Sequence, residues 1–150
     1  ARVAREAVET LERTRAVSAV AVREAGPAAL VATDPGLVRQ VLINLVANGL
    51  DAVEAAGGGT VTVEVRHLAR GARVAVRDTG AGIARENLAR VFDPFFTTKP
   101  PGAGTGLGLS ISQSIAASLG GRLDVRSRPG HGATFTLHLP RASRPDGERA

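Results

Sequence analysis

Residues 40 to 54, QVLINLVANGLDAVE, combine an apolar stripe and a polar stripe on one predicted helix. Asn44, Asn48 and Asp51 lie about one turn apart, so they form a polar line along the helix. Because asparagine is a mediocre helix former, its repeated use on one line indicates a role other than helix stability. The apolar residues recur at spacings of three and four, as in an amphipathic helix: Val41, Leu42, Leu45, Val46, Leu50 and Val53.

The first half of the chain alternates helical and extended patterns. A helix is predicted over 2–14, and short strands over 17–22 and 28–32, separated by the turn at Gly26. Asp34 followed by Pro35 predicts the start of the asparagine-bearing helix, which should run to about Ala56. The alternating segments 60–65 and 73–78 then predict a β-hairpin, with its turn at Gly71.

The second half predicts a loop with one short helix, then a longer helix and two strands. The longer helix spans 107–120, with Leu107, Ile111, Ile115 and Leu119 on one face. Strands are predicted over 121–128 and 132–140, and residues 141–150 have too little apolar content to fold. The pattern as a whole predicts an α+β sandwich, with helices on one face of a mixed sheet.

Composition limits the class of protein. The chain has 150 residues and is 43% hydrophobic, which suits one globular domain. It has neither an apolar run long enough to cross a bilayer nor a signal-peptide pattern. It also has no methionine, so we expect it to be a piece of a longer protein. Without cysteine it has no disulfide or thiolate metal site, and three scattered histidines do not suggest zinc.

The net charge of +5 raises the possibility of nucleic-acid binding. The eighteen arginines are spread along the chain without a basic block, and the only aromatic residues are four phenylalanines. A well-solvated surface is therefore the preferred interpretation, and no nucleic-acid partner is expected. The single lysine, Lys99, stands in a loop rich in glycine and proline. It is a candidate phosphate contact, with an ordinary solvated loop lysine as the alternative.

The glycine-rich run at 102–108, GAGTGLG, leads directly into the predicted helix, whose first amides would favour an anion. It fits neither common nucleotide motif. A P-loop needs lysine followed by serine or threonine, and Lys99 is followed by proline. The dinucleotide pattern fails because Leu109 stands where its third glycine belongs. A nucleotide would have to bind through a different motif.

Four segments in order indicate such a motif: NLVANGLDA, DTGAGIA, FDPFFTTK and GTGLGLSI, followed by GHGATF. Together they strongly resemble the ATP-binding catalytic domain of sensor histidine kinases, in the superfamily of gyrase, Hsp90, these kinases and MutL. The resemblance covers residues 34 to 139, and FFTTK looks most like the nitrogen-regulation class. It implies the Bergerat fold, a two-layer α/β sandwich with a mixed, mostly antiparallel sheet. Gly49, where the family more often has alanine, is a small departure.

The resemblance assigns roles along the polar line and beyond it. It makes Asn48 the ligand of Mg²⁺ and puts Asn44 at the phosphate end, although both amides could instead brace loops packed over the helix. Asp78 would accept a hydrogen bond from the adenine amine, and Thr134 would support that contact through water. Phosphoryl transfer would depend on Asn44, Asn48 and Lys99. The full set expected to contact ATP is Asn48, Asp51, Asp78, Gly80, Gly82, Ile83, Phe95, Lys99, Gly104, Thr105, Gly106, Leu107, Gly108 and Thr134.

The phenylalanines also acquire a role through the resemblance. Phe92, Phe95 and Phe96 would anchor a lid over the nucleotide, at about residues 97–105. Asn44 helps to separate kinases from ATP-driven clamps, which carry a glutamate there to activate water. Because an amide cannot take that proton, the residue argues against efficient hydrolysis.

The resemblance therefore implies a protein-histidine kinase whose catalytic domain covers 1–140. None of His67, His131 and His138 fits the acceptor histidine, which should lie in a dimerisation hairpin upstream. Residues 1–14 would be the end of the linker from that hairpin. The expected partners are the kinase's own dimerisation domain and a response regulator. The domain itself is expected to be cytoplasmic without direct membrane contact, whether or not the full protein is anchored.

Two alternatives to kinase activity stay open. One is a module that holds ATP and signals by ordering its lid, without transferring phosphate. The other is a different ATPase of the superfamily or a serine-kinase regulator of sigma factors. The phenylalanine-rich lid anchor speaks against the serine-kinase regulator.

Overall fold

A computed structural model describes residues 1–15, 20–26, 31 and 33–141. In this part of the chain the helices are α1 (Arg2–Arg15), α2 (Pro35–Ala55), α3 (Arg85–Leu88) and α4 (Gly108–Ser118). The strands are β1 (Val20–Ala25), β2 (Val61–Leu68), β3 (Gly71–Asp78), β4 (Arg122–Ser127) and β5 (Ala133–Pro140). Within these ranges, no helix is long and apolar enough to cross a membrane.

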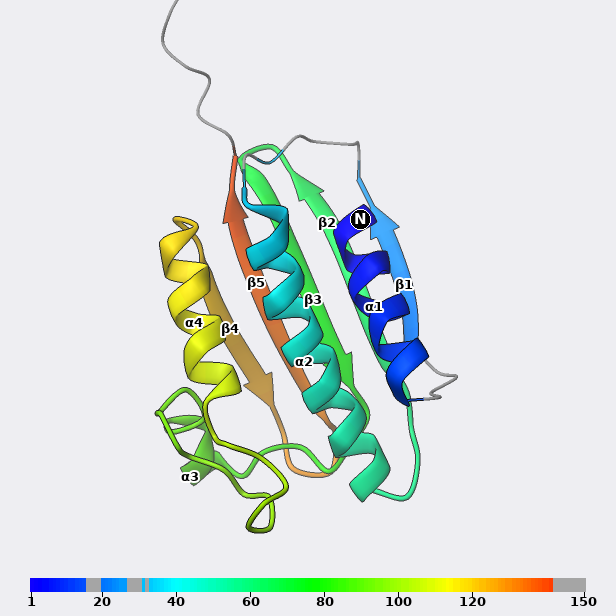
Figure 1. Ribbon diagram of the computed structural model, residues 1–150, viewed down its shortest axis with the longest axis vertical. Coiled ribbons are helices and arrows are strands. Elements are labelled where there is room, and N and C mark those ends of the chain that lie inside the picture. Colours follow the sequence, from blue (N-terminus) through cyan, green and yellow to red (C-terminus); the bar gives the residue numbers. More distant parts are fainter. Residues whose placement is uncertain (16–19, 27–30, 32, 142–150) are drawn as a thin grey trace, which may run out of the picture.

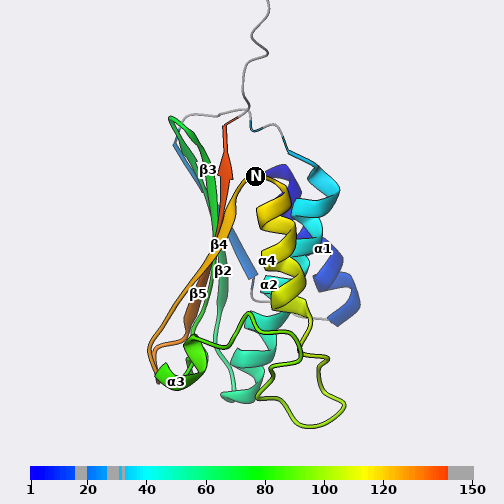
Figure 2. The ribbon, with the colours of Figure 1, turned by 90° about the vertical axis from the view of Figure 1, so that its left-hand side faces the viewer.

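The five strands form one sheet in the order β1-β2-β3-β5-β4. Only β1 and β2 run parallel, and the other neighbours are antiparallel. Helices α1, α2 and α4 all cover the same face, which leaves the other face of the sheet bare (Figures 1 and 2). The predicted two-layer sandwich with a mixed, mostly antiparallel sheet is confirmed.

The core lies between α2 and the middle strands. Alternate residues of β2 and β3 face the helices, and Val61, Val63 and Val76 are at most 2% exposed. The apolar stripe of α2 packs on them, with Val41 and Val46 fully buried. Helix α1 belongs to the same core because Ala4, Ala7, Val8 and Leu11 are buried in it. The predicted hairpin is confirmed by the antiparallel register of β2 and β3.

Some predictions at the N-terminal side fall outside the described residues. The strand predicted over 17–22 is present as β1, but its first residues lie in the undescribed range. Of the strand predicted over 28–32, only Val31 is described, and it is not in a strand. The predicted tail also lies outside, apart from Arg141.

The predicted apolar face of α4 is confirmed only in part, because Ile115 and Leu119 pack against the core. Ser112 and Ala116 face the core, whereas Ile111 is 45% exposed. Residues four apart advance by about 400° around a helix, so a line drawn in steps of four drifts by about 40° at each step. A single line in steps of four therefore does not follow the core-facing side of α4, which runs through Leu109, Ser112, Ala116 and Leu119 in steps of three and four.

Asp34 caps α2 as the sequence predicted. Its side-chain Oδ1 accepts hydrogen bonds from the backbone amides of Gly36 at 2.8 Å and Leu37 at 3.1 Å. We expect Asp34→Ala to lower the free energy of unfolding by about 1 kcal/mol, because these amides lose their partner. Asp34→Asn keeps an oxygen acceptor and should retain most of the stability. Urea denaturation of the three proteins measures this, and equal losses in both variants would contradict the capping role.

Candidate functional site

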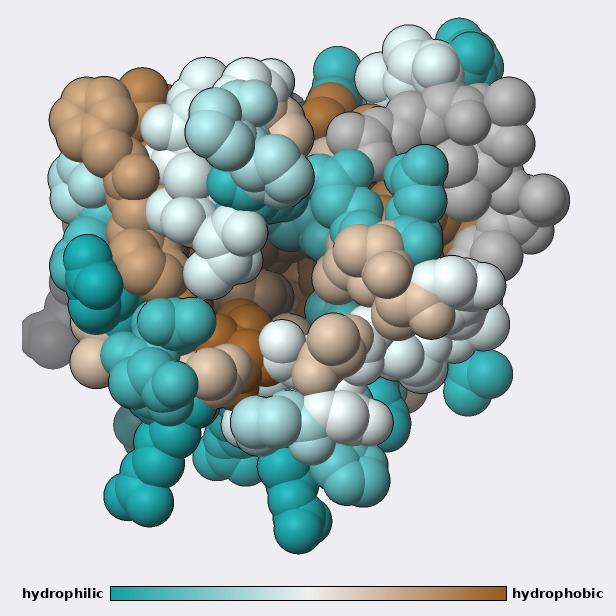
Figure 3. All heavy atoms as spheres, turned by 90° about the horizontal axis from the view of Figure 1, so that it is seen from below, coloured by the Kyte–Doolittle hydropathy of each residue, from teal (hydrophilic) through white to brown (hydrophobic). Residues whose placement is uncertain are grey.

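The polar line of α2 faces α4 and the loop before it. Asn44, Asn48 and Asp51 are each half-buried. Asn44 contacts α4 and Asp51 contacts the loop, so the line lies where these segments meet α2. At the end of the molecule that is lowest in Figure 1, the surface is hollowed, with apolar residues at the bottom of the recess (Figure 3).

Asn44 joins α2 to α4. Its Nδ2 donates to Oγ of Ser112 at 2.9 Å. A Cβ at Gly108 would overlap the side-chain oxygen of Asn44, so the helices approach this closely only because Gly108 has no side chain. The sequence did not point to Ser112, although a serine among apolar residues of a helix is the signal that could have found it. Both Asn44 and Gly108 therefore have a packing role whatever else they contact.

Asn48 differs from Asn44 in its contacts. Among the described residues, its amide makes no hydrogen bond, although the residue is half-buried on the same line. Its amide atoms are not among the buried polar atoms that lack a partner, so they remain accessible from outside. The oxygen of Asn48 is therefore available to a ligand beside α2.

Lys99 reaches back from the loop to α2. Its Nζ lies 2.5 Å from Oδ2 of Asp51, and the two side chains are 34% and 28% exposed. Asp51 stands one turn after Asn48, so the ammonium group is held beside the free amide. The only lysine of the chain is therefore not a freely solvated loop residue.

Asp78 ends β3 and is 5% exposed. Its Oδ1 accepts from the backbone amide of Gly80 at 2.9 Å and from that of Ala133 at 3.3 Å. Burial raises the pKa of this carboxyl above its ordinary value, and the two hydrogen bonds oppose that shift. Both recorded bonds use Oδ1, and no described residue donates to Oδ2. The second oxygen is therefore available to a hydrogen-bond donor.

The expected role of Thr134 does not fit the structure. Thr134 pairs with Arg77 on β3, and both line the bare face of the sheet, opposite to the helices. Asp78 faces the other side, where it is buried. Side chains alternate between faces along a strand, so the neighbouring Ala133 is on the side of Asp78 and reaches it through its backbone amide.

The glycines after β3 serve the packing of their loop. A Cβ at Gly80 would lie within 2.9 Å of three atoms of Ala52 on α2. Gly82 has φ +76° and would overlap the carbonyl of Arg128 if it had a side chain. The amide of the next residue, Ile83, donates to Oγ of Ser127 at 2.8 Å. The structure thus brings Asp78, Gly80, Gly82 and Ile83 together between α2 and the β4–β5 turn.

The loop at 97–105 is closed at its base. Phe95 donates its backbone N–H to the carbonyl of Gly106 at 2.9 Å, and Phe95 has the unusual φ of +65°. A side chain at Gly106 would overlap the backbone of Phe95. Phe92 packs edge-on against Phe135 of the core, with ring centroids 6.3 Å apart. The segment before the loop is therefore anchored by Phe92, whereas the ring of Phe95 itself is 74% exposed.

Two more expected residues lie in the second half of the loop. Oγ1 of Thr105 accepts from the amide of Leu107 at 3.3 Å, so this hydroxyl supports the local turn. Gly104 lies against the loop lysine, where a Cβ would be 3.2 Å from Cδ of Lys99. Both residues belong to the loop that contacts the polar line through Lys99 and Asp51.

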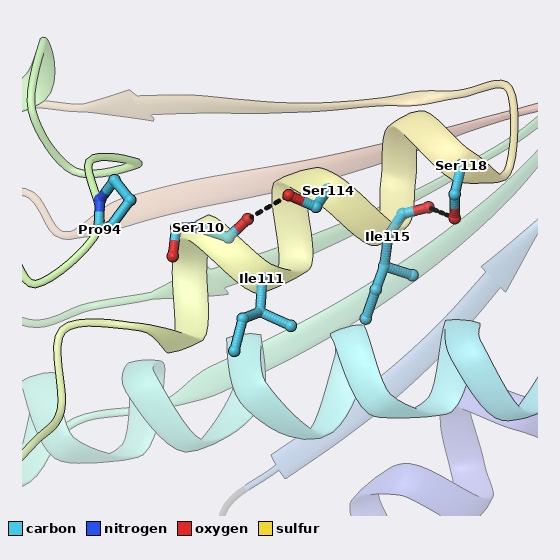
Figure 4. Close-up of a pocket in the computed structure, with 6 residues that line it drawn as sticks. All are labelled: Pro94, Ser110, Ile111, Ser114, Ile115 and Ser118. Carbon is cyan, nitrogen blue, oxygen red and sulfur yellow. Dashed lines mark hydrogen bonds between the residues drawn. The ribbon is translucent and has the colours of Figure 1, made fainter.

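A separate hollow of about 340 Å³ runs along the outer side of α4 (Figure 4). Its serines are engaged within the helix: Ser114 donates to the carbonyl of Ser110 at 3.1 Å, and Ser118 to that of Ile115 at 2.7 Å. None of the expected site residues lines it. We therefore place the candidate site at the polar line of α2 and at Asp78, and not in this hollow.

Comparison with protein families gives one match that covers most of the chain. Residues 33–143 match the family described as histidine kinase-, DNA gyrase B-, and HSP90-like ATPase. The curated relatives include sensor histidine kinase ZraS of Klebsiella oxytoca, 42% identical over 111 residues, and ZraS of Escherichia coli K12, 40% identical over 110 residues. Each alignment covers 73% of this chain and 23% of the relative, so the chain spans about a quarter of their length.

Solved structures agree with this match over nearly the whole chain. The catalytic domain of histidine kinase ThkA has a TM-score of 0.79 at 30% identity, covering 93% of this chain and 92% of that one. The mycobacterial sensor histidine kinase MprB has a TM-score of 0.74 at 25% identity, with 95% of each chain covered.

The buried carboxyl of Asp78 should make the folded state less stable as pH rises. Because its pKa is raised in the folded state, its contribution to stability is greatest below the ordinary aspartate range and is lost as pH rises through the raised value. Asp78→Asn removes this titration and keeps an oxygen for the two amides. We expect the stability of the wild type relative to Asp78→Asn to fall between pH 4 and pH 7. Urea denaturation at both values measures it, and a relative stability that rises with pH would contradict the assignment.

Proposed function

The chain belongs to the histidine kinase-, DNA gyrase B- and HSP90-like ATPase family, and we propose that it positions Mg-ATP for transfer of the γ-phosphoryl group to a histidine outside this chain. The observation that carries the proposal is the half-buried amide of Asn48, which no described residue satisfies, beside the only lysine of the chain. We infer histidine kinase activity of the whole protein from its relatives. This chain corresponds to about a quarter of their length.

Asp78 suits the adenine end of the nucleotide. Its Oδ1 is held by two backbone amides, so Oδ2 has a fixed direction and can accept from the exocyclic amine. Guanine carries an oxygen at that position, which would face the carboxylate without a proton between them. The site therefore favours adenine over guanine. ShkA, whose structure is 28% identical and has a TM-score of 0.73, is described as a complex with AMPPNP, which supports a nucleotide of this class.

Asn48 suits the metal end. Mg²⁺ prefers oxygen ligands and is commonly held by few protein groups together with substrate phosphates and water. The described residues contain no group of three or more histidine, cysteine and acidic side chains that could hold a metal alone. The available amide oxygen of Asn48 fits an ion shared with a triphosphate. When bound, Mg²⁺ would neutralise charge that develops on the phosphoryl oxygens.

The contacts of Asn44 favour phosphoryl transfer over hydrolysis. Its amide donates to Ser112 and has no basic group to take a proton from water. In the proposed reaction a neutral imidazole nitrogen forms the new N–P bond while the bond from the γ-phosphorus to the β–γ bridging oxygen breaks, and ADP leaves. Such a reaction depends mainly on positioning and charge stabilisation, which Asn48, Lys99 and the first amides of α4 would supply.

Two of the three histidines of this chain are engaged by acidic side chains. The side chain of His67 is 10% exposed and its Nε2 lies 3.0 Å from Glu24, while Nε2 of His138 lies 2.8 Å from Asp124. His131 lies in the turn before β5. We therefore propose that the acceptor belongs to a dimerisation domain elsewhere in the protein, and that a response regulator receives the phosphoryl group from it.

Asn48→Ala tests the proposal directly. Affinity for Mg-ATP should fall at least tenfold because the ion loses its protein oxygen, while adenosine, which needs neither metal nor phosphate, should bind as before. The free energy of unfolding should change by less than about 1 kcal/mol, since alanine is the better helix former. Isothermal titration calorimetry with both ligands measures this. A parallel loss of Mg-ATP and adenosine binding would mean that Asn48 only braces the site.

Lys99→Gln separates a phosphate contact from a loop support. Loss of one charge-assisted contact should weaken ATP binding about tenfold or more, with adenosine unaffected. Asp51→Asn breaks the same ion pair but leaves the ammonium group in place, so ATP affinity should stay the same or rise. Equal losses in the two variants would show that the ion pair itself, and not a phosphate contact, supports binding.

A further inference from the structure

Helices α1, α2 and α4 leave one face of the sheet bare (Figure 2), and a hollow on this face is lined by five arginines, Arg23, Arg73, Arg77, Arg122 and Arg126. The hollow has a volume of about 720 Å³ and receives side chains from all five strands. On the central strand β3 the small side chain of Ala75 lies between Arg73 and Arg77, and all three line the hollow. Because alanine has a short side chain, the hollow is deepest at Ala75, and an arginine lies on either side of it along the strand.

The strand register extends this arrangement across the sheet. Ala75 pairs with Glu64 on one side and Thr136 on the other. Arg77 pairs with two threonines, Thr62 and Thr134. Arg73 pairs with two further basic residues, Arg66 on β2 and His138 on β5. The sheet therefore carries two cationic rows. The row between them holds Glu64 and Thr136 beside Ala75, with Asp124 beyond Thr136 and Arg23 beyond Glu64.

The cations beside Ala75 are not used by the fold. Glu64 is paired with Arg66 at 3.0 Å, and Asp124 with Arg122 at 3.2 Å and His138 at 2.8 Å. By contrast, Arg73 and Arg77 make no ion pair with any residue of the described ranges. Their charges are left for solvent or for a partner.

We propose that this face docks an extended acidic segment of a partner protein, running along β3. Residues four apart on a strand are separated by about 13 Å and point to the same side, so acids at positions i and i+4 of such a segment would face Arg73 and Arg77. Position i+2 would lie over Ala75 beside Glu64, where a cationic or neutral side chain fits. Arginine is suited to this contact because its planar group binds carboxylate through two hydrogen bonds.

The same pattern disfavours nucleic acid. A phosphate backbone presents a regular row of negative charges, one of which would fall beside the carboxylate of Glu64. Single strands also bind by stacking bases on aromatic side chains, and no residue that lines this hollow is aromatic apart from His138. Alternating charge on the face is matched by a protein segment, which can place different side chains at each row.

The experiment uses the whole chain, labelled with ¹⁵N, at 50 mM NaCl without nucleotide. The probe is the peptide TETKTET, and the matched peptide TEETKTT has the same composition with its acids on opposite sides of an extended chain. We expect TETKTET to shift amide signals of β2, β3 and β5 and to bind at least tenfold more tightly than TEETKTT. Arg73→Gln with Arg77→Gln should weaken its binding at least tenfold.

The control is Arg2→Gln with Arg13→Gln, which removes the same charge from exposed positions of α1 on the other side of the molecule. Melting temperature and ATP affinity, measured for both double variants, verify that the fold and the nucleotide site are intact. Equal weakening in both would reveal a mere effect of net charge and overturn the proposal. Equal binding of the two peptides, no detectable binding, or tighter binding of a 12-base-pair DNA duplex at the same residues would also overturn it.

Discussion

The structure depends on the packing of α2, which carries two different surfaces on one helix. Its apolar stripe is buried against β2 and β3, where each buried valine or leucine contributes about 1.5–3 kcal/mol. Gly49 lets the helix lie close to the sheet, since a Cβ there would be 3.3 Å from both methyl groups of Val61 and 3.5 Å from Cβ of Asp78. Because the apolar stripe fixes the rotation of the helix, the polar line is fixed with it, facing α4 and the loop at 97–105.

The same approach of α2 to the sheet brings the two ends of the site together. Asp78 is buried under α2, and burial alone would make its charged form costly. Backbone amides of Gly80, in the loop after β3, and of Ala133, at the start of β5, offset this cost. The carboxylate therefore organises the loops as well as offering an oxygen to a ligand. A residue with both tasks needs two acceptor oxygens, and an amide would keep only one of them.

Most of the fold could be predicted from the sequence because its signals are local. The cap at Asp34, the alternation of β2 and β3 and the glycine turns each act within a few residues. The contact between Lys99 and Asp51 joins positions 48 residues apart, and no pattern along the chain indicates it. The error at Thr134 has a simple cause: a motif gives the order of residues, whereas the pleat of the strand decides which of two neighbours faces the site. The packing role of Gly108 against Asn44 was likewise hidden, because a glycine in a loop motif first suggests a ligand.

The loop at 97–105 is held by two interactions of unequal strength. At its base, Phe95 keeps a positive φ, which costs a bulky residue about 1–2 kcal/mol and persists only because its amide is bonded to Gly106 and its neighbours are packed. At the other contact, Lys99 and Asp51 are each about a third exposed, so their pair contributes about 1 kcal/mol or less. A triphosphate beside Asn48 carries more negative charge than one carboxylate and can take over the ammonium group. The hydrogen bond between Phe95 and Gly106 would then remain, while Lys99 would exchange Asp51 for the phosphates. The loop could therefore respond to the ligand without any rearrangement of the core.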